Sequence, residues 1–118
     1  MTSPGDELEP RESVRAAIDV APIGDDLVMV TVHDEIDLRE SAELRAVLND
    51  ACTGPHRSVA VDLRDVHFIG SSGMGVLAEV HGRLDAEGRR LLVLEPAEVI
   101  RQAFVMAGLP HILDLDDR

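Results

Sequence analysis

The alternation of apolar and polar positions near the start of the chain is typical of β-strands. Around Leu27–Val32, one side carries Val28, Val30 and Val32 while the other carries Met29, Thr31 and His33. Residues 14–21 are also expected to be extended, and Gly24-Asp25-Asp26 between the two segments has the composition of a turn. The pattern therefore predicts an antiparallel hairpin.

Three later segments have the spacing of amphipathic helices. The first begins with Asp37 and Glu40 at capping-box spacing, ends at residues 54–55, and has an apolar face made of Leu44, Val47, Leu48 and Ala51. The second is expected to begin at Ser71 or Ser72 and to end at Gly88. The third has Pro96 in its first turn, a stop at residues 108–110, and an apolar face made of Val99, Ile100, Ala103 and Phe104.

Short apolar runs at residues 58–63 and 91–94 predict strands between the helices, and residues 112–115 are expected to add a last short strand. The order is then β-β-α-β-α-β-α-β, which with right-handed crossovers predicts a mixed sheet covered by helices on at least one face. A chain of 118 residues fits one domain. Residues 1–12 lack apolar periodicity and are expected to form a mobile tail, so the α/β domain should span residues 13–118.

Composition narrows the classes of function. Acidic residues outnumber basic ones 23 to 11, and a net charge of −12 argues against nucleic acid and anionic membranes as partners. The chain has neither an apolar run of about 18 residues nor a basic start followed by an apolar stretch, so we expect a cytoplasmic protein. Cys52 is the only cysteine, which excludes an internal disulfide and argues against a zinc site.

Residues 59–77 contain the candidate chemistry, because a strand, a turn, two adjacent serines and closely spaced glycines follow one another there. A hydrolase elbow would require G-x-S-x-G, but Ile69 stands two residues before Ser71 and Met74 two residues after Ser72. The five histidines could supply a base, but structural roles are the simpler interpretation. We expect no catalytic residue and no enzymatic activity.

A dinucleotide fingerprint, G-x-G-x-x-A, is matched by residues 73–78, and Glu95 ends the next apolar strand where a ribose-binding acid would lie. The preceding strand ends near Leu63, however, too far from Gly73 for the tight turn that this fingerprint needs. Close helix packing at Gly73 and Gly75 is the better interpretation, and no cofactor is expected.

The third interpretation of this stretch is an exposed phosphoacceptor. A serine at a helix N-terminus lies beside unpaired backbone N–H groups and the positive end of the helix dipole, which can accommodate a phosphate. Alternatively, Ser71 or Ser72 is simply the N-cap, for which serine is a preferred residue. One serine suffices as a cap, which leaves the other free.

A longer pattern resembles a known family. Residues 61–77, V-D-L-R-D-V-H-F-I-G-S-S-G-M-G-V-L, are similar to the D-L-S-x-V-x-F-I-D-S-S-G-L-G-V-L run of the STAS domains of bacterial anti-sigma-factor antagonists. Residues 35–37, E-I-D, resemble the E-L-D that ends an early strand in that family, and the resemblance covers about residues 14–115.

The resemblance implies that Ser71 is phosphorylated by an anti-sigma factor that is itself a serine kinase, and dephosphorylated by a metal-dependent phosphatase. The unphosphorylated protein would capture the kinase and thereby free a sigma factor. The implied partner-binding residues are Asp37, Gly70, Ser71, Ser72, Gly73, Met74 and Gly75.

One departure from the family is Gly70, which stands where these domains commonly have Asp. The change removes a local negative charge and bears on which kinase recognises the site. An alternative function for a STAS-like domain is a small-ligand sensor, for a nucleotide or fatty acid, or a scaffold in a stress-signalling complex.

Overall fold

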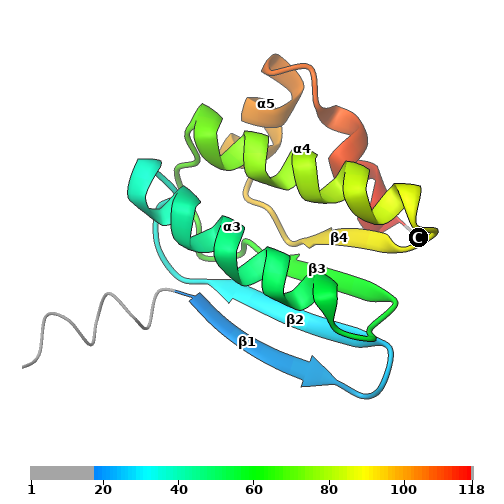
Figure 1. Cartoon of the computed structure of the whole chain (residues 1–118). Helices are drawn as coiled ribbons and strands as arrows, with labels where there is room; N and C mark the ends of the chain where they lie inside the picture. The colour runs from blue at the N-terminus through cyan, green and yellow to red at the C-terminus, as the bar shows by residue number, and fades with distance from the viewer. Residues whose placement is uncertain (1–17, 118) are drawn as a thin grey trace, which may run out of the picture.

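A four-stranded mixed sheet organises residues 18–117, the part of the chain that the computed structural model describes (Figure 1). Its strands lie side by side in chain order: β1 (Ile18–Ile23), β2 (Leu27–Val32), β3 (Ser58–Asp62) and β4 (Arg90–Leu94). β1 pairs antiparallel with β2, whereas β2 with β3 and β3 with β4 pair in parallel. The predicted single domain with a mixed sheet and an N-terminal hairpin is confirmed.

The hairpin turns at Gly24, whose φ of +70° is a conformation that glycine adopts without steric cost. Its register pairs Ile18 with Val32 and Ile23 with Leu27. The first strand was expected at residues 14–21, but it continues to Ile23. Residues 14–17 and the expected tail, residues 1–12, lie outside the described residues.

Three α-helices pack on the sheet within the described residues: α3 (Leu38–Thr53), α4 (Ser71–Ala86) and α5 (Glu98–Met106). α3 and α4 lie side by side across one face of the sheet (Figure 1). Their buried aliphatic faces meet Val28, Val30 and Val32 of β2 in one core. Nowhere in residues 18–117 is there a helix with both the length and the apolar character needed to cross a membrane.

The expected last strand at residues 112–115 is wrong, because Pro110–Asp117 forms a 3₁₀ helix, η1. Pro110 has no N–H to donate, and the tight helix brings the consecutive residues Ile112 and Leu113 into the core beside β4. A short apolar run does not by itself distinguish a strand from a buried helical turn.

The start of α5 also differs from the prediction. Pro96 precedes the N-cap residue Ala97 instead of lying in the first turn. The helix therefore begins later than expected. Its buried face also differs from the predicted one, because Ile100 and Phe104 are buried whereas Val99 is exposed.

Arg89 ties the end of α3 to the segment that leads into β3. Its guanidinium donates hydrogen bonds to the carbonyl oxygens of Cys52 at 2.8 Å and His56 at 3.1 Å, and it pairs with the Glu87 carboxylate at 2.8 Å. The side chain is only 16% exposed. Because the last carbonyl groups of a helix have no partner inside the helix, Arg89 satisfies acceptors that would otherwise remain unpaired.

We predict that Arg89→Met lowers the free energy of unfolding by about 1–3 kcal/mol, the usual cost of leaving partly buried acceptors without a charged donor. Arg57→Met is the matched control, since Arg57 is exposed and its side chain makes no hydrogen bond or ion pair with the described residues. Urea unfolding of both variants measures the difference. Equal losses of stability would contradict a specific role for Arg89.

Candidate functional site

The N-termini of α3 and α4 are held together by a short backbone bridge. Because β2 and β3 are parallel, their carboxyl ends reach the same edge of the sheet, and both helices start there. The Ile36 N–H donates to the Phe68 carbonyl at 2.9 Å, and the Gly70 N–H donates to the Ile36 carbonyl at 2.8 Å. This isolated parallel bridge between Ile36 and Ile69 makes the two helix starts neighbours.

Gly73 allows α4 to pack closely onto this bridge. A Cβ atom at Gly73 would lie 2.6 Å from Cγ2 of Ile36 and 2.9 Å from Cγ1 of Ile69, closer than unstrained carbon atoms approach. At Gly75, by contrast, a Cβ atom would meet no atom within 4 Å. The close-packing interpretation is therefore confirmed for Gly73 and wrong for Gly75.

The two serines have different surroundings although they are adjacent. The predicted start of this helix at Ser71 or Ser72 is confirmed, because α4 begins at Ser71, but the N-cap is Gly70, so the alternative that one of the serines is the cap is wrong. The Ser41 hydroxyl donates to the Asp37 carbonyl at 2.7 Å, and Ser72 Oγ lies 2.8 Å from Ser41 Oγ. Since Ser41 has a single hydroxyl proton, Ser72 must be the donor in the second bond.

Ser71 is left with a free hydroxyl. Its side chain is exposed, and it makes no hydrogen bond with the described residues. As the first residue of α4, it lies beside backbone N–H groups for which no side chain of the described residues acts as a cap. The positive ends of two helix dipoles converge on this position.

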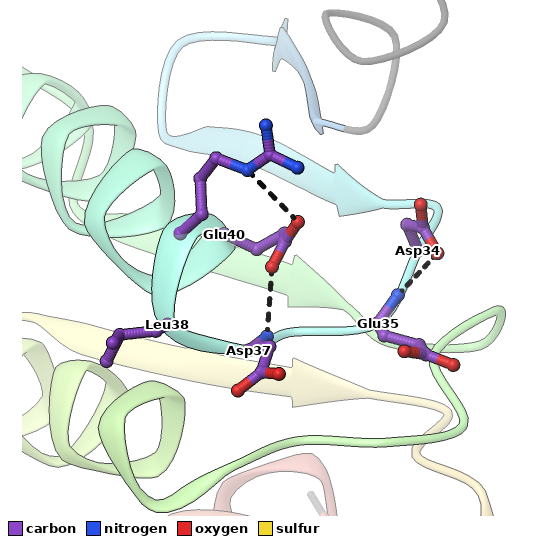
Figure 2. A pocket seen from close by; sticks show the side chains of 6 residues that line it. Asp34, Glu35, Asp37, Leu38 and Glu40 are labelled. Atoms are coloured by element: carbon purple, nitrogen blue, oxygen red, sulfur yellow. Dashed lines mark hydrogen bonds and ion pairs between the residues drawn. The ribbon is translucent and has the colours of Figure 1, made fainter.

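A group of carboxylates borders the start of α3. Asp34, Glu35, Asp37 and Glu40 line a shallow pocket together with Leu38 and Arg39 (Figure 2). The Asp37 N–H donates to Glu40 Oε1 at 3.2 Å, as in a capping box, while the Asp37 carboxylate points away from the Glu40 carboxylate (Figure 2). Among the described residues, no group of three or more His, Cys, Asp or Glu side chains is placed to hold a metal ion.

Gly70 has room for a side chain. A Cβ atom there would lie 3.6 Å from Oδ1 of Asp37 and 3.8 Å from Cε2 of Phe68, which are ordinary contact distances. An aspartate at this position would add a second carboxylate beside Asp37. The glycine therefore changes the charge next to Ser71 and is not required by the packing.

Two large apolar side chains near Ser71 are exposed, and neither was predicted from the sequence to belong to a site. Leu38 is 74% exposed and Phe68 is 47% exposed. Leu38 also lines a groove between α3 and α4 whose other lining residues are Ser41, Ala42, Arg45, Ser72, Gly75, Val76 and Glu79. Leu38 does not lie on the apolar face of the helix that begins at Leu44. This position in the helical period was the sequence signal that could have predicted an exposed leucine.

The predicted partner-binding residues are brought together but differ in exposure. Asp37, Ser71 and Gly75 are exposed, whereas Gly70 and Ser72 are half-buried. Gly73 is buried, and Met74 is partly buried against the core. Side-chain contacts with another protein are therefore open to the exposed members of the set.

The chain is similar to a known protein family and to several solved structures. The family model of the STAS domain matches residues 18–118. The anti-sigma factor antagonist SpoIIAA in its unphosphorylated form superposes with a TM-score of 0.72 at 21% identity, covering 82% of this chain and 85% of that one. SpoIIAA of Bacillus in the phosphorylated form gives a TM-score of 0.68 at 22% identity, over 82% and 88% of the two chains.

An anti-sigma factor antagonist from Mycobacterium paratuberculosis gives a TM-score of 0.72 at 23% identity, with 81% of this chain and 80% of that chain covered. At these identities the superpositions establish a shared fold, and the family match rests on the sequence of most of the chain. The protein belongs to the STAS domain family.

Proposed function

We propose that this protein is an anti-sigma factor antagonist that binds an anti-sigma serine kinase and is regulated by phosphorylation of Ser71. The observation that carries the proposal is the exposed, unbonded hydroxyl of Ser71 at the shared start of α3 and α4, in a fold that superposes on solved antagonists. The solved relatives include phosphorylated and unphosphorylated forms of one such antagonist.

The docking surface in this proposal is built around Ser71. The exposed side chains of Leu38 and Phe68 offer apolar area to the partner, while Asp37 offers a carboxylate. The groove between α3 and α4 continues this surface past Gly75. Burying such exposed apolar side chains is the main favourable term available to a partner that docks here.

Phosphorylation then reverses the interaction. The kinase transfers the γ-phosphoryl group of ATP to Oγ of Ser71, so the Oγ–P bond forms as the bond to ADP breaks and the hydroxyl proton passes to a base of the kinase. The added charge of about −1.5 to −2 is tolerated by the free N–H groups of the helix start, which preserves the fold. A partner that covers the same position must desolvate that charge, so it dissociates.

Partner switching follows from these two states. The unphosphorylated protein occupies the kinase and frees the sigma factor that the kinase otherwise holds. Removal of the phosphate by a metal-dependent serine phosphatase restores the binding form, and the exposure of Ser71 leaves that bond accessible. The protein is thus a substrate and a binding partner in the cytoplasm, and its net charge of −12 argues against direct contact with nucleic acid or membrane.

The proposal is tested by incubating the protein with the anti-sigma serine kinases of the same genome, one at a time, with ATP and mass spectrometry of the products. We expect one phosphate on Ser71, none on Ser71→Ala, and unchanged modification of Ser71 in Ser72→Ala. The reason is that Ser72 already donates its proton to Ser41 and is half-buried. Phosphate on Ser72, or failure of every kinase to modify the protein, would overturn the proposal.

A further inference from the structure

His33, which directly follows β2, lies between two carboxylates on opposite sides of its ring. Nε2 is 2.9 Å from Oδ2 of Asp19, and Nδ1 is 3.5 Å from Oδ2 of Asp65. A neutral imidazole has one N–H and can donate to only one of these groups, whereas the imidazolium donates to both. His33 can therefore donate to both carboxylates at once only when its ring is protonated.

The three residues come from three different segments. Asp19 belongs to β1, which is paired only with β2 among the described residues. Asp65 belongs to loop 63–69, which leads from β3 to Gly70 and the start of α4. Because the two carboxylates approach different nitrogens of the ring, these three side chains cannot all bind one metal ion. The neighbouring carboxylate of Asp34 accepts a hydrogen bond from the Glu35 N–H at 2.7 Å.

We propose that His33 is a pH-sensitive clip that, when protonated, holds the edge strand β1 and the loop before α4 against the end of β2, and that loss of its proton weakens this hold, because the neutral ring can donate to only one of the two carboxylates. The clip is separate from the proposed phosphorylation of Ser71 and does not depend on it.

The direction of the pH dependence follows from the charges that act on His33, which are the carboxylates of Asp19 and Asp65. The hydrogen bond to Asp19 is the main cause that raises the pKa of His33 above its usual value, and desolvation opposes it in part. A raised folded-state pKa means that the clip contributes fully below about pH 6.5, the value in the unfolded chain, and is lost as the pH rises through the folded-state pKa. His33 is 41% exposed, so salt should weaken the effect.

The test combines side-chain NMR titration with amide hydrogen exchange on the isolated protein. His67 is the control position for substitution, since it lies in the same loop as Asp65, is exposed, and makes no ion pair or hydrogen bond with the described residues. We expect the pKa of His33 to exceed its usual value of about 6.5, and to fall further in Asp19→Asn than in Asp65→Asn, because the Asp19 contact is shorter.

Hydrogen exchange of the β1 amides, corrected for the intrinsic effect of pH, measures the clip itself. If opening of β1 frees His33, protection at low pH should exceed protection at high pH by about tenfold per unit by which the pKa of His33 in the folded protein exceeds about 6.5. His33→Gln should make the protection of β1 equal at low and high pH, and His67→Gln should leave the difference unchanged. A His33 pKa at or below about 6.5 would overturn the proposal, and so would a raised His33 pKa without any pH-dependent protection of β1.

Discussion

A negative charge at Ser71 is expected to weaken binding of the kinase partner at least ~30-fold, whereas Ser71→Ala should bind like the unmodified protein. Ser71→Glu places a carboxylate on the proposed docking surface, where a partner must desolvate it without a matched cation. That penalty is typically ~2 kcal/mol or more, which corresponds to the stated change in affinity. The phosphorylated protein should bind more weakly still, because phosphate carries more charge than glutamate.

The fold should survive all three changes. Ser71 is exposed and is not the N-cap of α4, so Ser71→Ala removes no capping hydrogen bond and should change stability by less than about 0.5 kcal/mol. Ser71→Glu adds an acidic residue to the first turn of a helix, where the dipole favours it.

Calorimetric titration of the kinase with each form measures the effect. Ala46→Glu is the charge control, because Ala46 is exposed on α3 and lies outside the proposed surface. This variant gains the same charge and should keep its affinity. If the unmodified, alanine and glutamate forms of Ser71 all bind alike, the partner does not cover Ser71 and the proposed switch is wrong.

Gly73→Ala is expected to destabilise the protein by about 1–3 kcal/mol, the usual cost of forcing an extra carbon into a packed core. In an ordinary helix the same substitution would be stabilising, because alanine has the better helix propensity. Here the new methyl group would overlap Ile36 and Ile69, which are buried and whose backbones are joined by the bridge. Neither side chain can move away without disturbing the core.

Two glycines in the same helix provide the controls. A Cβ atom at Gly75 or Gly82 would meet nothing within 4 Å, so Gly75→Ala and Gly82→Ala should each stabilise the protein by about 0.5–1 kcal/mol. Denaturant unfolding of the three variants should therefore give opposite signs for Gly73 and its controls. A stabilising Gly73→Ala would show that α4 does not need close contact with the bridge.

Local rules predicted much of the fold. The alternation around β2, the glycine turn and the Asp37–Glu40 spacing each depend on residues close in sequence, and the hairpin and the start of α3 follow from them. The errors fall where local signals are ambiguous. Residues 112–115 have an apolar run short enough for a strand or a tight helix, and packing against β4 decides for the helix.

The adjacent serines show which properties of the site could be predicted from the sequence and which could not. Their position at a helix start could be predicted from the chain, and the resemblance to the STAS family pointed to Ser71 as the phosphoacceptor. Their different hydrogen bonding could not be predicted, because it depends on Ser41, which stands 31 residues before Ser72 and donates its own proton to the Asp37 carbonyl. Only the packing of α3 against α4 makes Ser72 a bonded donor and leaves Ser71 free.

The sequence by itself determined the order of the elements from β1 to α5, the hairpin, and the segment that contains Ser71, since each depends on periodicity or capping within a few residues. The tertiary structure alone decided that Gly73 contacts Ile36, that Ser72 bonds to Ser41, and that His33 lies between two carboxylates. These contacts join residues far apart in the chain. Their distances are set by the register of the parallel strands and by the bridge between the helix starts, which no local pattern encodes.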